Sequence, residues 1–230
     1  MTLSLCKQLD DRRQQRPEAL AYVIDGVGRS NEVSIDHVFR IANGLIAAGI
    51  GKGDRVAVLS RNSVECAEVM TGILCSGASM VPVPSTATPE AQRNMLADSA
   101  VKGLFVSDDY RGAALDQFLD LPSIRSELRF ALESACDVFS DHAAWAGQFP
   151  AASIDILMLL DEEYDLLSSS ATTGMPKGYL HCHFARHLLL SRPQANDFKG
   201  ETVFSPTTPY SNTTITNWYR SVTVGSTQNL

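Results

Sequence analysis

Short apolar runs alternate along this chain with longer stretches in which apolar residues recur at helical spacing. Residues 34–48 show the helical pattern, and Gly49 suits the position just past a helix end. Residues 55–59 then form a short, mostly apolar run typical of a buried strand. Such alternation predicts an α/β fold with largely parallel sheets covered by helices. The apolar positions that share one face of the predicted helix are Ile35, Val38, Phe39, Ile41, Ala42, Leu45 and Ile46.

The alternation continues through the first two thirds of the chain. Ser63 is placed to cap one helix, and Thr88 is placed to cap another whose first turn holds Pro89 and Glu90. The result is a series of strand–helix units in chain order. The remaining predicted strands are 19–24, 32–33 as the end of a return strand, 80–83, 101–106 and 128–132, and the remaining helices are 109–119 and 141–148.

Residues 149–153 fit neither pattern and are predicted to form a loop. The loop divides the chain into an amino-terminal α/β subdomain, residues 1–150, and an incomplete segment of a second α/β subdomain, residues 151–230. The length of 230 residues also allows one large domain, because domains cluster around ~100–150 residues and α/β folds often run longer.

Composition narrows the class of protein. Hydrophobic residues make up 44% of the chain and charged residues 20%, as in soluble globular proteins, and the net charge of -7 argues against nucleic acid as the main partner. Residues 1–16 lack the apolar run of a signal peptide, and the most apolar stretch, 73–84, is too short to cross a bilayer. We therefore expect a cytoplasmic protein with reduced thiols. The cysteines form no C-x-x-C pair: Cys6, Cys66, Cys75, Cys136 and Cys182.

The richest chemistry lies in residues 168–178, which read Ser-Ser-Ser-Ala-Thr-Thr-Gly-Met-Pro-Lys-Gly. Small side chains let backbone N–H groups converge on phosphate oxygens, hydroxyls add donors, and Lys177 adds positive charge. Gly178 follows the lysine where the P-loop of kinases and ATPases has Ser or Thr, so that family is excluded. A cluster of this composition also occurs in ordinary solvated turns.

The run from Thr172 to Gly178, preceded by two serines and followed by an aliphatic segment with His181 and His183, resembles the phosphate-loop motif of the adenylate-forming ligases. These include acyl-CoA synthetases, luciferases and peptide-synthetase adenylation domains. The likeness extends upstream through 34–59, Asn62-Ser63 and 77–84, and so covers nearly the whole chain. It implies the amino-terminal part of the acyl-CoA synthetase large domain, truncated.

The resemblance implies a two-step reaction that uses ATP, Mg²⁺ and coenzyme A. A small carboxylic acid attacks the α-phosphate of ATP to give an acyl-adenylate and pyrophosphate, and the acyl group then passes to a thiol. Thr172 and Thr173 are the strongest candidates for contact with phosphate. By the same similarity, the predicted ATP-phosphate-binding residues are Ser169, Ser170, Thr172, Thr173, Gly174 and Lys177.

The chain departs from the family pattern inside this motif. Ala171 stands where the family usually has Gly, and Ser168 stands where it has Tyr. If the loop needs a left-handed backbone at position 171, the Cβ there costs ~1–2 kcal/mol.

A second segment, Thr208-Pro209-Tyr210-Ser211-Asn212-Thr213-Thr214, resembles a motif in which an aromatic–His pair borders the acyl and ATP sites. Ser211 stands near the place of that histidine, so Tyr210 and Ser211 are predicted to border the substrate pocket. The family's ribose-binding aspartate, magnesium-associated acid and adenylation lysine would lie beyond Leu230, and no catalytic residue is assigned here.

Two further clusters, the histidine pair and an acidic run, could carry a function. His181 and His183 alternate, as on a strand, and would point the same way, but no third ligand is near in sequence, so no metal site is predicted. The acidic run 161–163 is typical of a solvated loop. Two functions stay open: a carboxylate ligase, or a truncated, non-catalytic relative that binds nucleotide weakly or binds a protein partner over its uncovered face.

Overall fold

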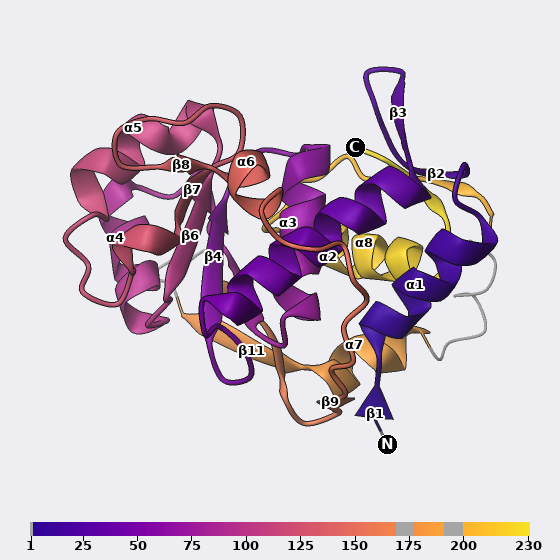
Figure 1. Cartoon of the computed structure of the whole chain (residues 1–230). Helices are drawn as coiled ribbons and strands as arrows, with labels where there is room; N and C mark the ends of the chain where they lie inside the picture. The colour runs from indigo at the N-terminus through magenta and orange to yellow at the C-terminus, as the bar shows by residue number, and fades with distance from the viewer. Residues whose placement is uncertain (1, 169–176, 191–199) are drawn as a thin grey trace.

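The computed structural model of the chain describes residues 2–168, 177–190 and 200–230 (Figure 1). In this part of the chain the strands form a seven-stranded sheet, a four-stranded sheet and the pair β1 (Thr2–Leu3) and β9 (Met158–Leu159). The predicted α/β class, with mostly parallel strands covered by helices, is confirmed.

The seven-stranded sheet has the order β11-β10-β5-β4-β6-β7-β8. All neighbouring pairs run parallel except β10 and β11, which run antiparallel. The central strands read as buried apolar runs, as expected for a parallel sheet with both faces covered. The strands are β4 (Arg55–Leu59), β5 (Ser79–Pro82), β6 (Gly103–Val106), β7 (Arg129–Ala131), β8 (Ser140–Asp141), β10 (Glu163–Ser168) and β11 (Gly178–Cys182).

The four-stranded sheet joins strands from the two ends of the chain. Its order is β12 (Thr202–Phe204), β13 (Thr227–Asn229), β2 (Leu20–Ile24) and β3 (Val27–Ser30). β13 runs parallel to both β12 and β2. Both larger sheets therefore contain strands from either side of residue 150, and a subdomain boundary there stays a prediction.

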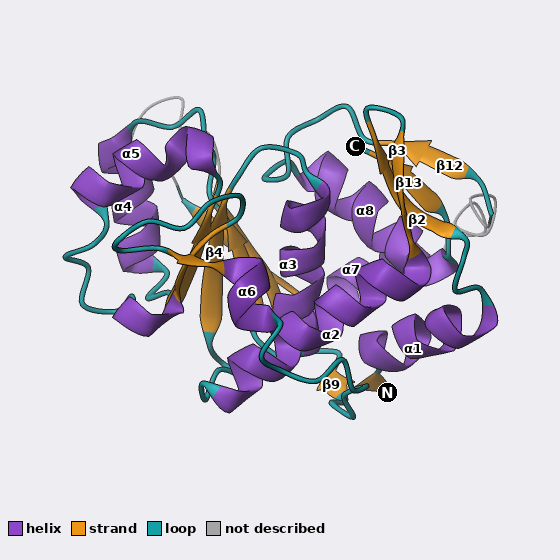
Figure 2. Cartoon of the chain, turned by 45° about the horizontal axis from the view of Figure 1, so that its top comes forward, coloured by secondary structure: helices purple, strands orange, loops and turns teal. Residues whose placement is uncertain are grey.

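Helices fill the space between the two sheets and cover the far face of the larger one. Figure 2 shows α2, α3 and α8 between the sheets, with α4 and α5 on the opposite side of the seven-stranded sheet. Each face has its own apolar core. The helices are α1 (Leu5–Gln15), α2 (Asn31–Ala47), α3 (Val64–Cys75), α4 (Pro89–Asp98), α5 (Asp108–Gln117), α6 (His142–Ala146), α7 (His183–Leu190), α8 (Asn212–Val224) and the 3-10 turn Ser126–Leu128.

Two predicted helix starts are confirmed and one is wrong. The hydroxyl of Ser63 accepts from the N–H of Cys66 at 3.0 Å, and that of Thr88 accepts from Ala91 at 3.3 Å. In contrast, α2 begins at Asn31 and not at Ser34.

The early start of α2 has a local cause. Ser30 has an extended backbone, and its hydroxyl accepts a hydrogen bond from the N–H of Val33, as helix caps do. Asn31 donates its side-chain amide to the carbonyl of Arg16. Residues 32–33 are therefore helical, and the predicted return strand ends at Ser30 instead.

Candidate functional site

The connected ends of β10 and β11 lie at the carboxyl edge of the parallel strands. β10 runs parallel to β5, so its carboxyl end lies at the same edge as the ends of β4, β5 and β6. Ser168 pairs with Gly178 at the end of the hairpin where the chain passes from β10 to β11. The two strand ends that residues 169–177 connect in sequence therefore lie at the edge where open α/β sheets bind ligands.

The predicted phosphate contacts divide between described and undescribed positions. Lys177, directly before β11, has an exposed side chain. The other predicted contacts lie outside the described residues, as does Ala171: Ser169, Ser170, Thr172, Thr173 and Gly174.

The segment 205–211 lies against the same edge of the sheet. The side-chain amide of Asn62, after β4, donates to the carbonyls of Ser205 at 3.3 Å and Thr207 at 2.9 Å. The hydroxyls of Tyr210 and Thr86, which follows β5, are 3.3 Å apart. Tertiary contacts thus bring the predicted substrate-pocket segment beside the loops of the parallel strands.

Tyr210 and Ser211 have different surroundings. Burial opposes ionisation of Tyr210, but hydrogen bonds from Thr86, Thr208 and Ser85 outweigh it and lower the pKa of the phenol. The hydroxyl of Ser211 caps α8 by accepting from the N–H of Thr213 at 3.3 Å. Ser211 therefore stabilises the start of α8, which its sequence context did not indicate. Its place at a substrate pocket stays a prediction.

A buried charged group lies inside the hairpin. Asp165 is fully buried on β10, and its Oδ1 is 2.7 Å from Nδ1 of His181 on β11. Its Oδ2 accepts from Nε of Arg186 at 3.0 Å and also from an Nη of the same guanidinium. Arg186, on α7, is only 2% exposed. Sequence reasoning missed this group, although an acid in the run Tyr164–Leu167 was a signal, because a carboxylate buried among apolar residues needs a partner.

A family model described as AMP-binding enzyme matches residues 9–230. The chain belongs to the AMP-binding enzyme family. The expectation drawn from the Thr172–Gly178 motif and the segments upstream of it is confirmed.

Two curated relatives show how far the similarity reaches. The chain is 30% identical over 171 residues to a fatty acid–acyl-carrier-protein ligase, ScoC, of Streptomyces coeruleorubidus, which covers 74% of the chain and 31% of ScoC. It is 29% identical over 206 residues to the long-chain fatty acid–CoA ligase FadD15 of Mycobacterium bovis, which covers 86% of the chain and 33% of that protein. The chain thus spans about a third of the length of these relatives.

Solved structures share the fold of this chain. The inhibitor-bound N-terminal domain of FACL13 from Mycobacterium tuberculosis has a TM-score of 0.81 at 23% identity, with 100% of this chain and 57% of that chain covered. The anthranilate CoA ligase AuaEII, in complex with anthranoyl-AMP, has a TM-score of 0.84 at 19% identity, with 100% of this chain and 45% of that chain covered. The predicted likeness to the amino-terminal part of an acyl-CoA ligase domain is therefore confirmed as a likeness of fold.

His181 and His183 do not lie as a strand pattern predicted. His181 is on β11 and contacts Asp165, whereas His183 begins α7 and packs edge-on against Tyr164, with ring centroids 5.1 Å apart. Burial lowers the pKa of His183 to about 4. The two side chains therefore have separate partners, because the strand ends between them. Among the described residues, no group of three or more His, Cys, Asp or Glu side chains is arranged to hold a metal ion.

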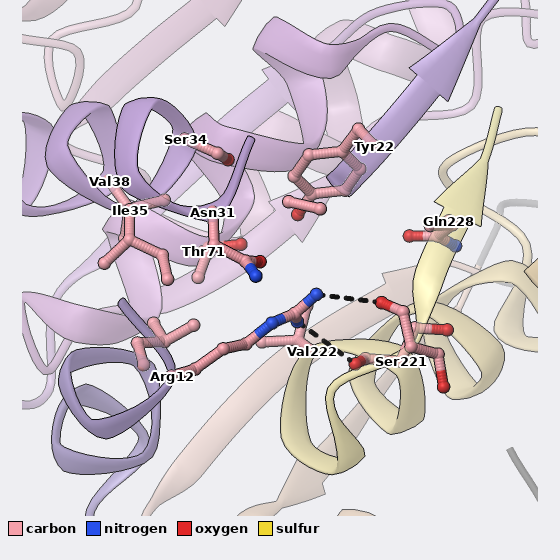
Figure 3. A pocket seen from close by; sticks show the side chains of 13 residues that line it. Arg12, Tyr22, Asn31, Ser34, Ile35, Val38, Thr71, Ser221, Val222 and Gln228 are labelled. Carbon is pink, nitrogen blue, oxygen red and sulfur yellow. Dashed lines mark hydrogen bonds between the residues drawn. The ribbon is translucent and has the colours of Figure 1, made fainter. Parts of the chain in front are cut away.

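A cavity between α1, α2 and α8 is too small to be the nucleotide site (Figure 3). Its volume is about 20 Å³, which is room for about one water molecule. Arg12 extends across it and donates to the carbonyls of Ser226 at 3.0 Å and Ser221 at 3.5 Å, at the carboxyl end of α8. The cavity thus belongs to the contact between the first and last helices, since a cation there complements the helix dipole.

Proposed function

We propose that this chain forms the phosphate-binding part of an ATP-dependent, AMP-forming ligase that activates a small carboxylic acid. A carboxylate oxygen would attack the α-phosphorus of ATP, and the bond to the bridging oxygen would break to release pyrophosphate. A thiol sulfur, proposed to be that of coenzyme A, would then attack the acyl carbon and release AMP.

One observation carries the proposal: Ser168 and Gly178, which the Ser/Thr/Gly/Lys segment 169–177 connects in sequence, pair at the carboxyl edge of the parallel strands. Donors gathered at such an edge neutralise the charge of a leaving pyrophosphate, and this reaction depends mostly on positioning and charge. The hydroxyls of Tyr210 and Thr86 and the cation of Lys177 suit phosphate and carboxylate oxygens. Magnesium is proposed only as the counterion that accompanies ATP.

The names of relatives support the proposed substrate class. ScoC and FadD15 are named for ligation of fatty acids, and AuaEII for ligation of anthranilate. We propose a carboxylic acid and leave its chain length open. A cytoplasmic location and a protein partner over the uncovered face stay predictions. In the part of the chain that the structure describes, no helix is both long enough and apolar enough to cross a membrane.

Lys177→Ala tests the phosphate loop in the full chain. We expect MgATP to raise the melting temperature of the unchanged protein, because a ligand that binds only the folded state stabilises it. The variant should lose most of this shift, since a cation next to the phosphates is removed. Lys7→Ala is the matched control: Lys7 is exposed on α1 and forms an i,i+4 pair with Asp11, so its loss should leave the ATP shift unchanged.

An undiminished ATP shift in Lys177→Ala would show that segment 169–177 is not the phosphate site. Pyrophosphate release with a panel of carboxylic acids, with and without Mg²⁺, then separates the two functions that the sequence left open. Acid-dependent release supports the ligase. ATP binding without release supports the non-catalytic, nucleotide-binding relative.

A further inference from the structure

The buried charges of the hairpin connect it to a helix from a different part of the chain. We call Asp165, His181, Arg186, Asn212 and Thr216 the Asp165 cluster. Arg186 reaches Asp165 on β10 with its Nε at 3.0 Å, and Asp165 also contacts His181 on β11. On the other side, an Nη of Arg186 donates to Oδ1 of Asn212 at 2.8 Å and to Oγ1 of Thr216 at 3.2 Å.

The two sides of the cluster lead to the two predicted walls of the site. Asp165 lies three residues before Ser168, and His181 lies three residues after Gly178, so both are near the end of the hairpin where β10 connects to β11. Asn212 is the first residue of α8 and directly follows Tyr210 and Ser211. One guanidinium therefore bridges the β10–β11 hairpin and the helix that begins at the substrate-pocket segment.

The chemistry of the bridge favours a positioning role over simple stabilisation. A buried ion pair gains little over an apolar pair of the same volume, because both charges lose their hydration. Its geometry is nevertheless specific, since the planar guanidinium offers donors in fixed directions. Arg186 also lies over the Tyr164 ring, 5.6 Å from its centroid, which fixes the plane of the guanidinium further.

We propose that Arg186 is a positioning residue that couples the β10–β11 hairpin to the start of α8 and so fixes segment 205–211 relative to the paired residues Ser168 and Gly178. What these two walls bind rests on the proposed function. The coupling itself does not, and it is measured without ligand.

The test uses substitutions on α8 and a readout on the hairpin in the full chain. Thr216→Val keeps the shape of the side chain and removes one acceptor of Arg186, and Asn212→Ala removes the other. Hydrogen exchange is measured for the amides of β10 and β11 at a temperature where every variant is folded. We expect exchange in the hairpin to become roughly fivefold faster for each change, because each removes one hydrogen bond of Arg186.

Glu163→Gln is the matched control, since Glu163 starts the same strand β10 and pairs with Arg55 at 2.8 Å and 2.9 Å. This change removes a charge pair from the hairpin without touching the Asp165 cluster. Arg186→Lys keeps the charge and loses the fork, so it should resemble Thr216→Val and not the unchanged protein. The dissociation constant for MgATP is measured for all variants and should rise roughly fivefold for the cluster variants alone.

Each outcome decides. Hairpin exchange that stays unchanged in both α8 variants overturns the coupling, and unchanged ATP affinity beside faster exchange overturns the positioning role. If Arg186→Lys has the exchange rates and ATP affinity of the unchanged protein, the role of the fixed guanidinium geometry is overturned. If the unchanged protein does not bind ATP, the proposed function fails, and the exchange data still decide whether Arg186 couples the two elements.

Discussion

His183 and Tyr164 show how burial controls single side chains near the hairpin. Tyr164 is fully buried, and its ring lies edge-on between His183 and Tyr219, whose centroids are 5.1 Å and 5.0 Å away. Burial raises the pKa of Tyr164 well above 10 and keeps its hydroxyl neutral. His183 is 4% exposed and is held neutral for the same reason. Both therefore serve as packed aromatic groups at neutral pH.

A neutral His183 makes stability depend on pH. Burial lowers its pKa to about 4 in spite of the attraction of Glu162 and Asp165, whereas the unfolded chain has a value of about 6.5. Between these values the unfolded chain binds a proton that the folded protein does not, so stability falls as the pH falls through this window. From pH 7.5 to 4.5, we expect the unchanged protein to lose on the order of 2–3 kcal/mol more than His183→Phe.

Urea unfolding at the two pH values measures this difference. His142 also has a pKa lowered by burial, but it is present in both proteins and cancels in the comparison. Equal losses in the unchanged protein and in His183→Phe would mean that His183 is not buried in its neutral form.

At the scale of elements, α2 and α3 approach each other closely at a glycine. A Cβ built on Gly72 would come within 2.7 Å of Ile41 Cγ2 and within 3.2 Å of the carbonyl oxygen of Val38. Ile41 is 1% exposed and Val38 is 2% exposed, and the Val38 oxygen belongs to the backbone of α2, which a side-chain rotation cannot move. The absence of a side chain at position 72 therefore allows the two helices between the sheets to pack.

Gly72→Ala should lower the free energy of unfolding by about 1–3 kcal/mol, because the added methyl overpacks the contact with Ile41. Gly112→Ala, in α5, is the matched control, since a Cβ there would have nothing within 4 Å. The control should be neutral or stabilising by up to about 1 kcal/mol, as expected for Gly→Ala inside a helix. Urea unfolding curves give both values. Equal effects of the two changes would show that α2 and α3 are not in close contact at Gly72.

At the scale of the whole molecule, strands from the two ends of the chain pair in one sheet. The N–H of Leu230 donates to the carbonyl of Val23 at 3.0 Å, and β13 lies between β12 and β2. The core between the sheets includes Ile215 and Trp218 of α8 together with residues of α2 and α3. A shared core of this kind predicts cooperative unfolding of the two halves.

The two tryptophans of the chain test this cooperativity. Trp145 lies on α6, after β8, and its ring centroid is 4.3 Å from that of Phe130 on β7, whereas Trp218 is buried on α8. We expect the single-tryptophan variants Trp145→Phe and Trp218→Phe to show fluorescence transitions in urea that coincide with the loss of helical circular dichroism. Two separated transitions would instead support independent subdomains divided near residue 150.

The features that the sequence alone determined depend on interactions between residues close together in the chain. The caps at Ser63 and Thr88, the buried strand Arg55–Leu59 and the family motif Thr172–Gly178 all depend on residues a few positions apart. The predicted start of α2 at Ser34 is wrong because Ser30, itself at the end of β3, caps a helix that begins at Asn31, three residues earlier.

Tertiary structure alone decided the contacts between distant segments. The pairing of β13 with β2 and the bridge from Asp165 through Arg186 to Asn212 join residues that no local pattern relates. A strand's partner depends on which edges and apolar faces the rest of the chain leaves available. A buried carboxylate likewise shows in sequence that it needs a partner, but the folded chain determines which side chain that partner is.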